Sequence, residues 1–122
     1  MRFLLPLFSL GCLLLTGTMN TVHAEETATE QAAWNNYHKL DQELTDLYQK
    51  ILISLSNEKS RENFTKSENT WLEFRQAQGI FVAEDPKGGA PSKALMAANF
   101  TETTETRIAQ LKKWQTTSPE AK

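Results

Sequence analysis

Cysteine and histidine are almost absent from this sequence, which removes the usual side chains of metal and nucleophilic chemistry. The only cysteine is Cys12, and the only histidines are His23 and His38, in a chain of 122 residues. A metal centre needs several convergent ligands, and no His or Cys spacing supplies them. Nucleophilic catalysis needs a histidine base with an orienting acid, and His38 near Asp41 fits an ordinary surface histidine better. We therefore expect no metal, no cofactor and no enzymatic activity.

The N-terminal 24 residues have the three regions of a secretory signal peptide. Arg2 is followed by an apolar run over 3–15, a polar stretch, and small residues at −3 and −1 of a cleavage site after Ala24. The run is shorter than the ~20 residues that a membrane span needs. We expect cleavage after Ala24, a periplasmic or secreted protein, and no membrane span afterwards. Lipidation at Cys12 is the weaker alternative, because too few residues precede it.

Charge is low and gives no sign of nucleic-acid binding. The chain has 13 Lys and Arg against 15 Asp and Glu, a net charge of −2, without a basic stripe. Nucleic-acid binding depends on such a stripe, so we exclude this class of partner. Losing Arg2 with the signal peptide leaves 12 basic and 15 acidic residues, a net charge of −3. A mild negative charge favours cationic partners.

Three stretches beyond the signal peptide have the apolar periodicity of helices. Neither glycine nor proline occurs over residues 30–78, and apolar residues recur there at steps of three and four. Ser56 or Asn57 can cap the second helix and Ser92 the third. We expect helices over about residues 30–54, 58–78 and 92–114. The fold class that follows is all-α: an elongated antiparallel three-helix bundle, with room for a short extra helical segment and no sheet.

Each expected helix has a stripe of residues that we predict to be buried. In the first helix the stripe comprises Tyr37, Leu40, Leu44, Leu47, Ile51 and Leu55. In the second it comprises Phe64, Trp71, Phe74 and Phe81. In the third it comprises Met96, Ala97, Phe100, Thr104, Ile108 and Leu111. Packing of these stripes must hold the helices together, since single helices are marginal in water.

Residues 83–91 (AEDPKGGAP) form the one clear loop and the main candidate site. They hold two of the four prolines and two glycines, which mark turns. In an antiparallel bundle this loop lies at one end. We expect Lys87, the backbone of Gly88 and Gly89, and Ser92 to bind a partner. The tail over 115–122 is polar, contains a proline and should fray.

Trp71 and Arg75 lie one turn apart on the second expected helix and allow two interpretations. Trp71 can be a core residue covered by Arg75, with the arginine paired to an acid of the first helix such as Asp41. Alternatively, the pair belongs to a partner-binding surface, where Trp and Arg are enriched. The sequence favours the first interpretation.

Several short motifs together resemble the LprI-like lysozyme-inhibitor family. In order along residues 30–113 they are Leu40-Asp41-x-Glu43-Leu44-x-x-x-Tyr48, Phe64-x-x-x-Glu68-x-x-Trp71-x-x-x-Arg75, Gly88-Gly89 and Thr104-x-x-Arg107-x-x-x-Leu111. The resemblance implies a helical, exported protein, with Asp41, Leu44, Tyr48, Trp71, Arg75, Arg107 and Leu111 as its structural motif. It also implies that the partner is lysozyme or another cationic envelope protein.

The chain departs from the family pattern at two positions that usually hold cysteines. Gly79 and Asn99 stand there, so the resemblance implies that a disulfide has been lost. Losing a native disulfide typically costs about 2–5 kcal/mol. We therefore expect a looser loop over 83–92.

Two functions stay open at this point. The first is a secreted periplasmic protein that inhibits a lysozyme-type muramidase by loop insertion or by blocking its cleft. The second is a non-inhibitory interaction module of the envelope, with Trp34, Trp114 and His38 as its contacts. The sequence also leaves open whether the loop or a helix face makes the contact.

Overall fold

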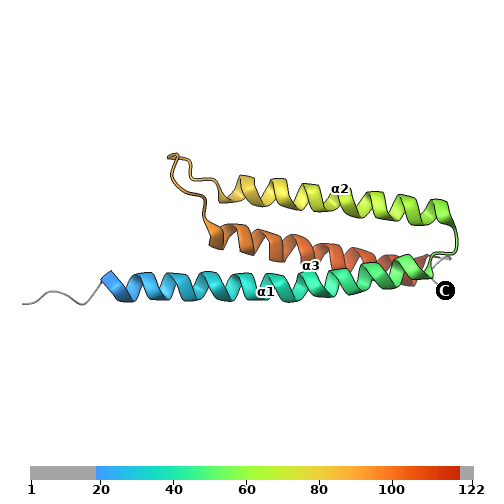
Figure 1. The fold of residues 1–122 in the computed structure, drawn as a ribbon, viewed down its shortest axis with the longest axis horizontal. Helices are drawn as coiled ribbons and strands as arrows, with labels where there is room; N and C mark the ends of the chain where they lie inside the picture. Colours follow the sequence, from blue (N-terminus) through green and yellow to red (C-terminus); the bar gives the residue numbers. More distant parts are fainter. Residues whose placement is uncertain (1–18, 119–122) are drawn as a thin grey trace, which may run out of the picture.

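The chain folds into three long helices, each of which runs antiparallel to the next, so that the first and the third run in the same direction (Figure 1). The computed structural model describes residues 19–118, with side chains from Ala28 onward. The helices are α1 (Met19–Ser54), α2 (Glu58–Ala83) and α3 (Lys93–Thr117). Figure 1 shows an elongated bundle in which α3 packs against both other helices, whereas α1 and α2 make few direct contacts. The all-α bundle is confirmed, and the described residues contain no strand.

Capping side chains set the start of α2 and of α3. Asn57 is the cap of α2, because its Oδ1 accepts hydrogen bonds from the backbone N–H groups of Lys59 (2.8 Å) and Ser60 (3.3 Å). Ser92 caps α3 by accepting from the N–H of Leu95 at 3.2 Å. Both caps were among the predicted ones. They determine where α2 and α3 begin.

The other helix ends extend beyond the expected boundaries. α1 already begins at Met19, α2 continues to Ala83 rather than ending near Gln78, and α3 continues to Thr117. Residues 115–117 of the predicted tail are therefore helical. The predicted signal peptide lies largely outside the described residues. Within those residues, no helix is both long and apolar enough to cross a membrane.

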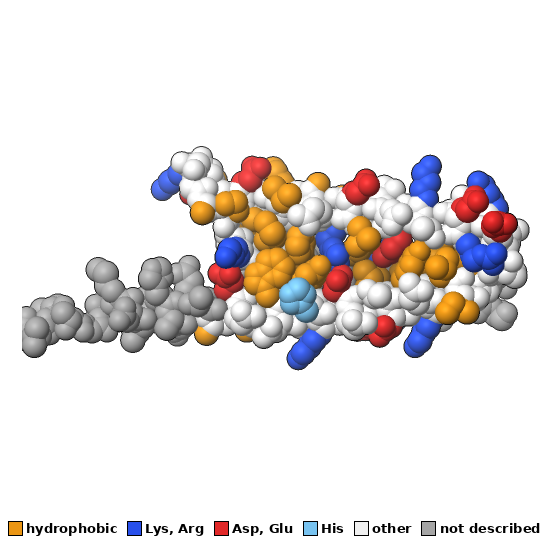
Figure 2. Space-filling model, in the orientation of Figure 1, with side chains coloured by type: hydrophobic (Ala, Val, Ile, Leu, Met, Phe, Trp, Pro, Cys, Tyr) orange, Lys and Arg blue, Asp and Glu red, His pale blue; other side chains and the backbone are white. Residues whose placement is uncertain are grey.

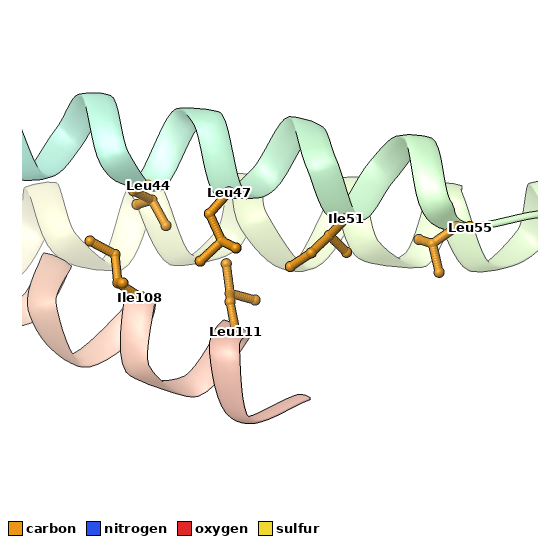
Figure 3. Close-up of a cluster of buried hydrophobic side chains, with 6 residues drawn as sticks. All are labelled: Leu44, Leu47, Ile51, Leu55, Ile108 and Leu111. Atoms are coloured by element: carbon orange, nitrogen blue, oxygen red, sulfur yellow. The ribbon is translucent and has the colours of Figure 1, made fainter. Parts of the chain in front are cut away.

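The main core lies between α1 and α3. It consists of Leu44, Leu47, Ile51, Leu55, Ile108 and Leu111, and Figure 3 shows these side chains pointing toward one another. Their spacing of three and four residues gives each helix a single apolar stripe. Ile51 is completely buried. The stripes predicted for the first and third helices are thus confirmed at these positions.

α2 packs differently, and two predictions for it are wrong. Phe74 and Phe81 were expected in the core, but they are 54% and 72% exposed. The buried residues of α2 are Glu68, Arg75, Gly79 and Ala83. These follow one another at steps of seven, four and four residues, so they share one face, and the two phenylalanines fall outside it. α2 can bury charged side chains because Arg75 pairs with a residue of α1 and Glu68 pairs with a residue of α3. The other buried positions of α2 are small residues.

Candidate functional site

Arg75 is the centre of an internal network that joins all three helices. Its Nη1 donates to Oδ1 of Asp41 on α1 at 2.6 Å and to Oγ1 of Thr104 on α3 at 3.0 Å. Its guanidinium also lies over the ring of Trp71, 4.9 Å from the centroid. The structure agrees with the first interpretation of Trp71 and Arg75, in which Arg75 covers Trp71 and pairs with Asp41.

A second buried pair joins α2 to α3. Arg107 donates from Nε and Nη2 to Oε2 of Glu68, at 3.0 and 2.9 Å, and Nη2 also reaches the hydroxyl of Ser67. The side chains of Arg107 and Glu68 are only 13% and 7% exposed. Figure 2 shows such charged side chains set among the hydrophobic ones in the valley between α1 and α2. This network holds the helices in register.

The remaining motif residues also hold the fold together. Leu44 and Leu111 belong to the core. The Tyr48 hydroxyl lies 3.0 Å from Oγ1 of Thr65, and its ring stacks on Phe64 with centroids 5.0 Å apart, which links α1 to α2. A partner-binding surface must therefore be sought among residues that the motif does not use.

The segment between α2 and α3 is an exposed loop closed by one carboxylate. Asp85 accepts the N–H of Lys87 at Oδ1 (2.9 Å), the N–H of Gly89 at Oδ2 (3.1 Å) and the N–H of Gly88 at its backbone oxygen (2.9 Å). Gly88 has a φ of +78°, a conformation that glycine adopts without strain. The loop extends away from α1 at one end of the bundle (Figure 1).

The same geometry decides which of the predicted binding groups are free. The N–H groups of Gly88 and Gly89 are already used within the turn. Ser92 caps α3 and donates its own N–H to the oxygen of Ala83 at 2.8 Å, which closes the base of the loop. Within residues 19–118, the ammonium group of Lys87 has no ion pair. Lys87 is therefore the predicted site residue whose polar group can still engage a partner.

The two positions of the expected lost disulfide lie where α2 meets α3. Gly79 is packed so closely against Phe100 that an added Cβ would overlap its ring. Asn99, next to Phe100, has a buried Oδ1 that accepts no hydrogen bond from the part of the chain that the structure describes. Close helix packing occupies this region in place of a covalent bridge, and the loop base is closed by hydrogen bonds.

The residues of the alternative interaction surface are only partly accessible. Trp34 and Trp114 are half-buried. Trp34 packs edge-on against Tyr37 and Phe100, and Trp114 stacks on Phe64. His38 is exposed, but its ring contacts the rings of Trp34 and Tyr37.

A metal site would need at least three His, Cys, Asp or Glu side chains close together. In the described part of the chain, no such group occurs.

The most exposed apolar residues near the loop were not predicted as a surface. Phe74, Ile80 and Phe81 of α2 and Leu95 of α3 are between 45% and 72% exposed; we call these four residues the outer apolar surface. A groove of 290 Å³ between α2 and α3 begins beside Phe74. The spacing of Phe74 and Phe81 was the available signal, because residues seven apart share one face of a helix, and this face differs from the one that contains Glu68 and Arg75.

Comparison of the sequence with known proteins gives one match, to a protein family. The family model described as lysozyme inhibitor LprI matches residues 19–111, which span α1, α2 and most of α3. No curated protein and no solved structure matches the chain.

Proposed function

The chain belongs to the LprI family of lysozyme inhibitors, and from this membership we propose that it is an exported inhibitor of a lysozyme-type muramidase. It acts by binding, not by catalysis, and residues 1–24 serve as its signal peptide. The contact with the enzyme is made by the loop between α2 and α3, with Lys87 at its centre.

One observation carries this proposal: Lys87 is exposed and has no ion pair with any described side chain, and it lies on a turn that Asp85 closes through three backbone N–H groups. Muramidases cleave between two carboxyl groups in a cleft. An ammonium group that enters this cleft can pair with a carboxylate and displace the substrate. Because hydrogen bonds within the turn already hold its backbone, less conformational entropy is lost when it binds.

Replacing Lys87 tests the proposal directly. We expect Lys87→Ala to weaken inhibition by a factor of about 30 or more, because losing one partner of a desolvated charge pair costs about 2 kcal/mol or more. Lys87→Glu should weaken it further, since it places a like charge against the enzyme's carboxylates. The measurement is the inhibition constant for lysis of a peptidoglycan suspension by muramidases of several types.

Lys66→Ala is the matched control, because Lys66 is an exposed lysine of α2 without an ion pair within residues 19–118. It should inhibit like the wild type. Full inhibition by Lys87→Ala would rule out the loop mechanism. A folded wild-type protein that inhibits no muramidase at large molar excess would instead favour the alternative, a non-inhibitory interaction module of the envelope.

A further inference from the structure

α2 has an inverted distribution of side chains for a helix on the surface of a bundle. It buries Glu68 and Arg75, whereas Phe74, Ile80 and Phe81 are 54%, 45% and 72% exposed. Scattered exposed apolar residues are common, but a cluster of large ones marks an interaction surface. We propose that the outer apolar surface docks on the same muramidase as the loop, against an apolar patch flanked by basic residues; this inference rests on the proposed function.

Two members of the outer apolar surface flank the loop in the sequence. Phe81 lies in the last turn of α2, and Leu95 lies in the first turn of α3, on either side of residues 84–92. Phe74 and Phe81 are seven residues apart, which is about two helical turns and ~10 Å along one face. Figure 2 shows hydrophobic side chains at the outer edge of α2 beside the loop. In our proposal, a partner that binds Lys87 extends along the end of α2 and covers Phe81 and then Phe74.

The charges around this surface indicate what kind of partner fits it. Glu73, Glu84 and Glu102 are exposed, and none of them forms an ion pair within the described residues. Asp85 adds a fourth acid, and Lys87 is the one base on the loop. A cationic protein surface complements this pattern. A second copy of the chain would bring the same carboxylates toward one another, which disfavours self-association.

Phe81 is the residue that should contribute most to this contact. Aromatic side chains are enriched at the centres of protein interfaces, and a few of them contribute most of the binding energy. Phe81 is the most exposed member of the surface and the nearest of the α2 residues to the loop. Truncating it should therefore weaken binding even though Lys87 is intact.

The test compares Phe81→Ser and the double variant Phe74→Ser/Phe81→Ser with Ile53→Ser. Ile53 is 82% exposed and lies in the last turn of α1, at the end of the bundle opposite the loop, so it is the matched control. Circular dichroism and thermal unfolding should be unchanged, because all three residues are exposed. We expect Phe81→Ser to weaken inhibition by about tenfold or more, the double variant to weaken it further, and Ile53→Ser to behave like the wild type.

The possible failures have different signatures. If the wild type inhibits and the double variant inhibits equally well, the outer apolar surface is no part of the contact and the inference is wrong. If sedimentation shows a wild-type dimer that Phe81→Ser dissociates, the surface belongs to a second copy. If the wild type inhibits no muramidase, the proposed function itself fails, before any variant is compared.

Discussion

At the scale of single residues, buried charges are the feature that most distinguishes this protein from a simple apolar bundle. Glu68 and Arg107 are both largely removed from water and satisfy each other. Desolvating two such charges is costly, so the pair adds little net stability over an apolar pair. Removing one partner of the pair is strongly destabilising, because the remaining charge is left buried and unpaired.

We therefore expect Glu68→Ala to lower the free energy of unfolding by about 3 kcal/mol. Glu68→Gln should cost less, about 1–2 kcal/mol, because its amide oxygen can still accept from Arg107. Urea denaturation followed by circular dichroism measures both. The control is Glu62→Ala, since the Lys59–Glu62 pair is exposed and should contribute less than about 1 kcal/mol. Equal stability of Glu68→Ala and the wild type would contradict the role given to this pair.

At the scale of elements, the start of α2 could be predicted from the sequence but the face that it buries could not. Asn57 supplies a local signal, since it caps the helix by accepting hydrogen bonds from the N–H groups of residues only two and three positions further along the chain. The buried face depends on Arg75 and Glu68, whose partners are 34 and 39 residues away in the chain. Apolar periodicity alone therefore selected Phe74 and Phe81 as core residues.

Gly79 shows how closely α2 approaches α3. Alanine in place of glycine in a helix usually gains about 1 kcal/mol, but the added methyl group would overlap the buried ring of Phe100. Overpacking of this kind costs about 1–3 kcal/mol, so we expect Gly79→Ala to lower the melting temperature. Phe100→Leu should reduce that penalty in a double-mutant cycle. A Gly79→Ala protein more stable than the wild type would show that the ring can move aside.

The loop was predictable in position and in part of its chemistry. Its prolines and glycines mark the turn, and Lys87 is indeed at an exposed position. The use of the Gly88 and Gly89 N–H groups by Asp85 was missed. An aspartate that precedes such a turn often accepts backbone N–H groups, so the local sequence held a signal for the closed turn.

At the scale of the whole molecule, the three helices meet around Tyr37. Its ring lies 5.2 Å from that of Phe100 on α3, and the guanidinium of Arg75 on α2 lies 5.2 Å from its centroid. Burial raises the pKa of Tyr37 above 10.0, and the charge of Arg75 acts in the opposite direction. The folded state thus favours the neutral phenol, which keeps its full contribution to stability below the unfolded pKa.

Stability should fall as the pH rises through the raised pKa of Tyr37, because the unfolded chain loses this proton first. We expect the free energy of unfolding of the wild type to fall more steeply above about pH 10 than that of Tyr37→Phe, which has no phenol to ionise. Urea titrations between pH 8 and 11 measure both slopes. Parallel curves would mean that Tyr37 ionises equally easily in both states.

The central position of α3 also determines when the molecule can fold. A chain is synthesised from its N-terminus, so α1 and α2 are complete before α3 exists. These two helices make few contacts with each other, and both depend on α3 for their packing. The core residues of α1 pack against Ile108 and Leu111, which are synthesised much later. Until α3 has been made, the α1 residues of the main core lack the α3 side chains against which they pack in the folded protein.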